Sequence, residues 1–125
     1  MSFLAVGIGA FLGANLRFIL GTWAAERFGV DFPYGTLIVN VSGAFAVGVV
    51  LAFMGERLGL SPQWRLFFVT GFLGGYTTFS SYAWEALVLA EDGAWARAAV
   101  YVLGSNVVGF IGVWLGAMLA RLVPA

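Results

Sequence analysis

Several residue types are missing from this 125-residue chain, and each absence removes a class of function. There is no cysteine and no histidine, which excludes disulfides, thiol nucleophiles, thiolate or imidazole metal sites and histidine general bases. Charged residues make up only 10% of the chain and the formal net charge is zero, so nothing indicates nucleic-acid binding. A nucleophile–base pair is hard to assemble from what remains, and we expect no enzyme.

What the chain does contain is apolar. Hydrophobic residues make up 62% of it, and the mean hydropathy is +0.97. Such a composition is far outside the soluble range, and the length suits about four membrane helices of ~20 residues each. We predict an all-α integral membrane protein with a single domain over residues 1–125. Its four transmembrane helices are expected at 3–25, 33–54, 63–90 and 94–122, with the first retained as an uncleaved span.

The few arginines barely distinguish the two sides of the membrane. An even number of spans puts both termini on one side, with Arg57, Arg65 and Arg121, and leaves Arg27 and Arg97 on the other. This is almost no bias under the positive-inside rule. Either the chain inserts in both orientations and forms an antiparallel dimer, or it has too few arginines to show a bias. Charge alone favours neither.

Small residues recur at four-residue spacing, which lets helix backbones approach closely in lipid. The pairs are Gly9/Gly13, Ala44/Gly48, Gly71/Gly75 and Gly112/Gly116. We therefore expect tight packing within a bundle or a dimer.

The segment 74–82, Gly-Gly-Tyr-Thr-Thr-Phe-Ser-Ser-Tyr, interrupts a membrane-length apolar run with glycines, hydroxyls and aromatic rings. Lipid offers no partner to freed backbone groups, so a helix can loosen there only against protein or a water-filled path. Phe79 and Tyr82 share one helix face, with Ser81 on the adjacent one. Ring edges and hydroxyls can both contact an anion. The segment is either an ion or solute site or aromatic packing at a glycine-permitted kink.

Other polar residues inside the spans allow two interpretations each. Asn40 is a donor along a pore or a hydrogen-bonding link between helices. Arg17 attracts anions in a vestibule or packs against carbonyl groups, and Glu85 lies in a vestibule or carries protons. Tyr101 and Ser105 lie four residues apart on one face, where they continue a polar track or act only as an interface anchor and a common mid-span hydroxyl.

Three motifs together resemble the Fluc/CrcB fluoride channel family, and the resemblance covers nearly the whole chain. They are Gly-x-x-Leu-Arg-aromatic at 13–18 (with Ala14 and Asn15 at the variable positions), Gly-Thr-x-x-x-Asn at 35–40 and Gly-Gly-x-Thr-Thr-Phe-Ser at 74–80. The resemblance implies a small prokaryotic channel that exports fluoride passively across the cytoplasmic (inner) membrane. It also implies an antiparallel, dual-topology homodimer with two pores and a third helix broken at its centre.

The same resemblance implies roles for individual residues. Gly74 and Thr77 match positions whose backbone carbonyls hold a structural sodium ion at the dimer interface, four carbonyls in all from two subunits. Arg17 and Glu85 would belong to vestibules. The pore and fluoride-binding positions would be Asn40, Phe79, Ser80, Ser81, Tyr82, Tyr101 and Ser105. Tyr82 stands where the family has a second pore phenylalanine, so it keeps the ring edge and adds a hydroxyl.

Two alternatives belong to other classes. A small multidrug-resistance-type transporter is also a four-span, dual-topology dimer, but it would carry a glutamate in its first span, where this chain has Arg17. A non-transporting membrane assembly subunit would explain the glycine pairs. It would leave the combination of Asn40, Phe79 and the Thr/Ser cluster without a purpose.

Overall fold

All regular structure in the described part of the chain, residues 1–124 of a computed structural model, is helical. The helices, in chain order, are α1 (Ser2–Phe28), α2 (Tyr34–Val49), η1 (Val50–Arg57), α3 (Pro62–Arg65), η2 (Leu66–Leu73), α4 (Gly74–Tyr76), α5 (Phe79–Glu91) and α6 (Trp95–Leu122). Elements η1 and η2 are π-helical and continue the α-helices before them. The prediction of an all-α protein is confirmed.

Three helices are long and apolar enough to cross a membrane, judged by length and composition. They are Ser2–Phe28, Tyr34–Arg57 and Trp95–Leu122, and the segment between the second and third is also helical but interrupted. The chain thus has the features of an integral membrane protein.

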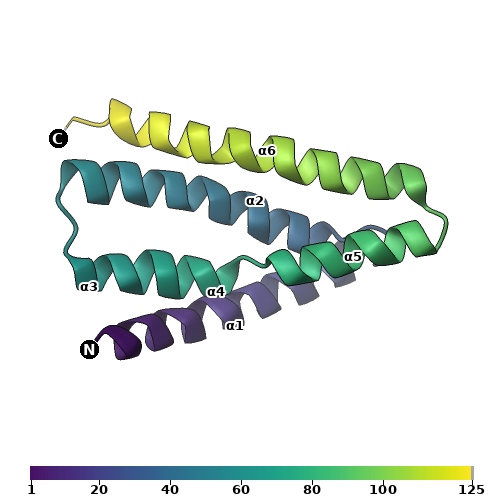
Figure 1. Ribbon diagram of the computed structural model, residues 1–125, viewed down its shortest axis with the longest axis horizontal. Helices are drawn as coiled ribbons and strands as arrows, with labels where there is room; N and C mark the ends of the chain where they lie inside the picture. The colour runs from purple at the N-terminus through teal and green to yellow at the C-terminus, as the bar shows by residue number, and fades with distance from the viewer. Residues whose placement is uncertain (125) are drawn as a thin grey trace.

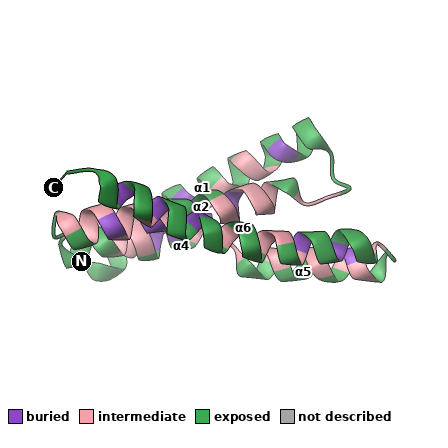
Figure 2. Ribbon diagram, turned by 90° about the horizontal axis from the view of Figure 1, so that it is seen from above, coloured by how far each residue is buried: buried purple, intermediate pink, exposed green. Residues whose placement is uncertain are grey.

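The helices run back and forth along one long axis, and both termini lie at the same end of the bundle (Figure 1). Seen from above, α1 and α2 diverge from α5 and α6 toward the other end, where the loops 29–33 and 92–94 lie (Figure 2). The molecule is therefore closely packed at one end and split into two helix pairs at the other.

Glycines with positive φ lie in three of the connections between helices. Gly29, Gly59 and Gly93 have φ angles of 86°, 67° and 79°, a region that side chains with a Cβ rarely adopt. Three residues after Gly59 the next helix begins with Pro62 in its first turn. The Ser61 hydroxyl caps this helix by accepting from the Trp64 N–H at 3.4 Å.

Glycines allow close backbone contact at two helix–helix interfaces. In the first, α1 lies against η2 and α4, and a Cβ on Gly13 would overlap the Phe72 carbonyl oxygen. In the second, α2 lies against α6, and a Cβ on Gly116 would overlap the Phe45 carbonyl oxygen. Small residues at four-residue spacing thus permit backbone-to-backbone contact, as membrane helices require.

The interior is small for a chain of this size. Two buried clusters are present, one around Tyr76 and Val39 and one around Tyr101 and Leu89. Exposed residues cover much of every long helix (Figure 2), and large apolar side chains such as Phe110, 73% exposed, are among them. Such a surface suits lipid or a second protein chain rather than water.

Candidate functional site

The centre of the site is a two-residue interruption between α4 and α5. Thr77 and Thr78 have extended backbones, with φ/ψ of −89°/160° and −150°/117°. The Thr77 hydroxyl donates to the Leu73 carbonyl at 3.0 Å, across the last turn of the preceding helix. The Thr78 hydroxyl accepts from the Ser81 N–H at 3.2 Å and so caps the start of α5.

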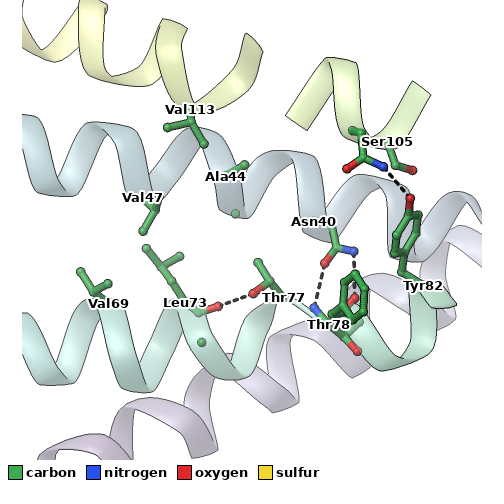
Figure 3. Close-up of a pocket in the computed structure, with 14 residues that line it drawn as sticks. Asn40, Ala44, Val47, Val69, Leu73, Thr77, Thr78, Tyr82, Ser105 and Val113 are labelled. Carbon is green, nitrogen blue, oxygen red and sulfur yellow. Dashed lines mark hydrogen bonds between the residues drawn. The ribbon is translucent and has the colours of Figure 1, made fainter. Parts of the chain in front are cut away.

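Asn40 on α2 pairs with both backbone groups of Thr78. Its Nδ2 donates to the Thr78 carbonyl at 2.9 Å, and its Oδ1 accepts from the Thr78 N–H at 2.8 Å (Figure 3). One glycine makes this possible, because a Cβ on Gly43 would overlap the Thr77 methyl group. The amide therefore replaces the helical hydrogen bonds that the interruption removes, and it retains one N–H for another partner.

Arg17 on α1 satisfies a second backbone group beside the interruption. Its Nε donates to the Gly75 carbonyl at 3.0 Å, one of the last carbonyls of α4, which has no helical donor because the helix ends. Cations are stabilised near helix C-termini. On the opposite side, the Tyr76 and Ser42 hydroxyls bond at 2.8 Å.

Three backbone carbonyls at the same place accept no hydrogen bond within residues 1–124. These belong to Gly74, Tyr76 and Thr77. In a continuous helix the N–H groups of Thr78, Ser80 and Ser81 would reach them, but those of Thr78 and Ser81 bond to Asn40 and to the Thr78 hydroxyl instead. Gly74 is exposed, and Thr77 is partly buried. Free carbonyls of this kind favour a cation.

An open groove of about 450 Å³ runs beside the interruption (Figure 3). Predicted site residues among its lining are Asn40, Gly74, Thr77, Phe79, Tyr82 and Ser105. Phe79 is 78% exposed. The Ser105 Oγ is buried and has no hydrogen-bond partner within residues 1–124, which is uncommon for a buried polar atom.

Aromatic rings and polar groups follow one another from the groove along α5 and α6. The ring centroids of Phe79 and Tyr82 are 5.8 Å apart, and those of Tyr82 and Tyr101 are 5.2 Å apart. The Tyr101 hydroxyl donates to Glu85 Oε1 at 3.1 Å. Asn106 Nδ2 donates to the Tyr82 hydroxyl at 2.7 Å.

Not every predicted residue lies at this groove. Arg17 and Ser81 line a neighbouring hollow of about 360 Å³. Glu85 lines a hollow of about 500 Å³ between the diverging helix pairs. Tyr101 is fully buried and lines none of these three hollows, and Ser80 is exposed, with its Oγ 3.4 Å from the Thr78 Oγ1.

Three residues of the site were not among the predicted site residues. Thr78 makes the contacts with Asn40, Asn106 contacts Tyr82, and Thr36 lines the hollows that contain Ser81 and Glu85. In the sequence, the one sign that these residues belong to the site is that each is a polar side chain within an apolar run. Their partners lie on other helices, so spacing within one helix could not identify them.

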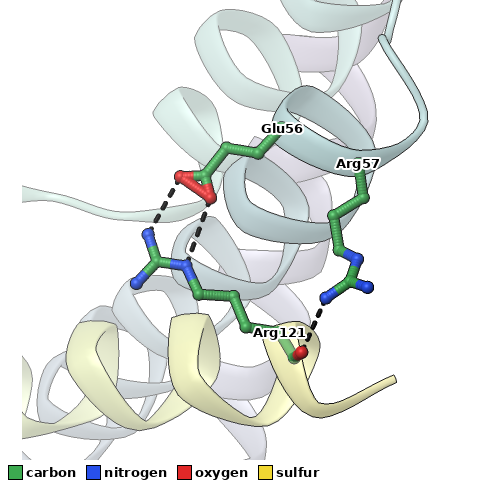
Figure 4. A network of polar contacts seen from close by, with 3 residues as sticks. All are labelled: Glu56, Arg57 and Arg121. Atoms are coloured by element: carbon green, nitrogen blue, oxygen red, sulfur yellow. Dashed lines mark hydrogen bonds and ion pairs between the residues drawn. The ribbon is translucent and has the colours of Figure 1, made fainter. Parts of the chain in front are cut away.

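A second polar region lies at the other end of the bundle, near the C-terminus (Figure 4). Arg121 donates from Nη2 and Nε to the two Glu56 carboxylate oxygens at 2.9 and 3.2 Å. Arg57 Nη1 donates to the Arg121 carbonyl at 2.6 Å. The two side chains of the ion pair are about half exposed, 50% for Arg121 and 53% for Glu56.

Comparison with known proteins gives consistent results. The family model described as "CrcB-like protein, Camphor Resistance (CrcB)" matches residues 4–117. The fluoride-specific ion channel FluC of Roseiflexus sp. (strain RS-1) is 53% identical over 124 residues, covering 99% of this chain and 100% of the relative. The protein of the same name from Solibacter usitatus is 46% identical, covering 97% and 99%. That from Chloroflexus aurantiacus (strain J-10-fl) is 48% identical, covering 94% of each chain.

Proposed function

The chain belongs to the CrcB-like protein family, and from that premise we propose that it is a fluoride-specific ion channel through which fluoride leaves the cell passively. The observation that carries this function is the match, over nearly the full length of both chains, to relatives that bear that name. The chain is a multi-pass prokaryotic membrane protein, and its task is transport rather than catalysis.

The proposed anion path uses groups that can each replace part of the hydration shell of fluoride. Compact donors and ring edges suit a small, strongly hydrated anion, and several weak sites in a row permit exit. The free Ser105 hydroxyl, the remaining Asn40 N–H and the exposed Phe79 ring support this path at the open groove. We assign Ser80, Ser81, Tyr82 and Tyr101 to the same path, and Arg17 and Glu85 to its vestibules.

We further propose that residues 62–91 form a third, broken span, which gives four spans in all. Their summed length, the common end of both termini and the paired backbone groups at Thr77 and Thr78 support this proposal. Without Asn40, the two Thr78 backbone groups would meet lipid or a neighbouring chain unpaired.

A second, antiparallel copy would complete the site. Phe79 projects from the chain with 78% of its surface exposed, and the groove beside it is open. A ring that lines a pore needs protein on its far side, and a dual-topology homodimer with two pores would provide it. The near-equal distribution of arginines allows insertion in both orientations, and the family resemblance favours it.

Two of the free carbonyls fit a sodium ion at the dimer interface. Gly74 and Thr77 offer hard, uncharged oxygen atoms, and the 74–77 segment leaves both without a hydrogen-bond donor. Within residues 1–124, no group of three acidic side chains could hold a metal instead. A bound sodium ion would supply positive charge between two helix ends that carry partial negative charge.

Flux from liposomes tests the proposed function. Purified protein reconstituted into vesicles loaded with equal fluoride and chloride should release fluoride rapidly and retain chloride. The Phe79→Ile variant should release fluoride more slowly while remaining the same size by gel filtration. Equal loss of both anions, or no fluoride loss from well-folded protein, would overturn the proposal.

A further inference from the structure

The hydroxyl of Tyr82 is held by α6. Asn106 Nδ2 donates to it at 2.7 Å, and its oxygen lies 3.3 Å from the Val102 carbonyl oxygen (Figure 3 shows the first bond). Both contacts keep the hydroxyl oxygen against α6.

The orientation of the Asn106 amide follows from its second partner. Its Nδ2 also donates to the Val102 carbonyl, at 2.8 Å. A carbonyl cannot donate, so the atom that contacts it must be the NH₂ group. The same NH₂ group donates its other proton to the Tyr82 hydroxyl oxygen. Asn106 thus links that oxygen to the Val102 turn of α6.

The ring that these contacts hold is part of the groove. Tyr82 and Asn106 line it together with Phe79 and Asn40. The Tyr82 ring packs against those of Phe79 and Tyr101, at centroid distances of 5.8 and 5.2 Å. These contacts and the bond from Asn106 to its hydroxyl restrict rotation of the ring.

We propose that Asn106 is a positioning residue for the anion path, which holds the Tyr82 hydroxyl against α6 so that Tyr82 presents its ring and not its hydroxyl to a permeating anion. The proposal rests on the channel function proposed above. Tyrosine at position 82 would then act as phenylalanine does, and Asn106 would be the residue that permits it. A released hydroxyl would bind fluoride more tightly and slow its exit, because conduction needs weak binding at each site.

A double-mutant cycle tests this with fluoride efflux from liposomes. Asn106→Leu should lower the fluoride rate about tenfold, as expected for the loss of one well-formed hydrogen bond. Tyr82→Phe keeps the ring, lacks the hydroxyl, and sets the reference rate for the cycle. The double variant should match Tyr82→Phe within about twofold, because without the hydroxyl Asn106 has nothing left to position.

The rescue separates positioning from simple packing. If Asn106 only stabilised α6 against α5, the double variant would be at least as slow as Asn106→Leu, and this result would overturn the proposal. Asn15→Leu is the matched control, because Asn15 donates only to its own helix, to the Phe11 carbonyl at 2.6 Å, and its rate should not change.

Two further outcomes are distinguishable. If Asn106→Leu does not fold, Asn106→Ser keeps a polar group too short to reach Tyr82, and the same rescue is expected. A wild-type protein that carries no fluoride would refute the channel function itself. A conducting wild type with an unaffected Asn106→Leu variant would refute only the role of Asn106.

Discussion

The two polar regions of this molecule use similar side chains for different tasks. At the interruption between α4 and α5, Asn40 and Arg17 bond to backbone groups that have lost their helical partners. At the end of the bundle, Glu56 and Arg121 bond to each other in a half-exposed position. Water can replace the second set of bonds, whereas the first set is partly buried and serves backbone groups that have no helical partner.

The difference indicates where the stability of the site originates. A buried backbone group without a partner costs the full desolvation penalty, whereas a surface ion pair contributes little and weakens with salt. Removal of single side chains should therefore affect the two regions unequally. Four substitutions, from the largest expected effect to the smallest, test this contrast.

Asn40→Leu should have the largest effect. It leaves both Thr78 backbone groups unpaired, at a cost of about 2 to 6 kcal/mol. We expect a clear fall in the midpoint of thermal unfolding in detergent, together with loss of fluoride flux. The Asn15→Leu control should melt like the wild type. A stable, conducting Asn40→Leu protein would show that the interruption does not depend on this amide.

Arg17→Met should come second. It removes one charge-assisted hydrogen bond to the Gly75 carbonyl, a contribution of about 1.5 to 3 kcal/mol. The methionine retains most of the apolar volume, so the change in thermal stability reports on the lost bond. An unchanged melting midpoint would mean that water can donate a hydrogen bond to the Gly75 carbonyl in place of Arg17.

Thr78→Ala should be milder. The Thr78 hydroxyl caps α5 by accepting from the Ser81 N–H, and loss of such a cap costs about 1 kcal/mol. Thr78→Ser keeps the hydroxyl and is the matched control. Equal stability of the alanine and serine variants, measured by thermal unfolding, would show that the Thr78 hydroxyl does not stabilise α5.

Glu56→Gln should change least. It breaks the ion pair with Arg121 while keeping the shape of the side chain, and water can hydrate both groups. Any loss of thermal stability should shrink further when salt is added. A loss as large as that of Asn40→Leu would abolish the proposed distinction between the two regions.

The sequence predicts much of the molecule because its strongest signals are local. Long apolar runs predict the helices, and the 74–82 segment marks the place where helical geometry fails. Its three motifs also led to the correct family.

The contacts between helices could not be predicted in the same way. Asn40 and Thr78 are 38 residues apart, and nothing in their spacing shows that the two helices align there. Asn106 and Tyr82 pair across two helices for the same reason. Glu56 and Arg121 are connector and terminal charges in the sequence, and only the tertiary structure brings them together.

The most direct test of the central claim is the reversal potential of the current through the reconstituted protein in a planar bilayer. Fluoride and chloride gradients of opposite direction would be imposed at constant pH. A passive, fluoride-selective channel predicts reversal at the fluoride equilibrium potential, unchanged when a pH gradient is then added. Reversal at the chloride potential, or a shift that follows the pH gradient, would contradict it.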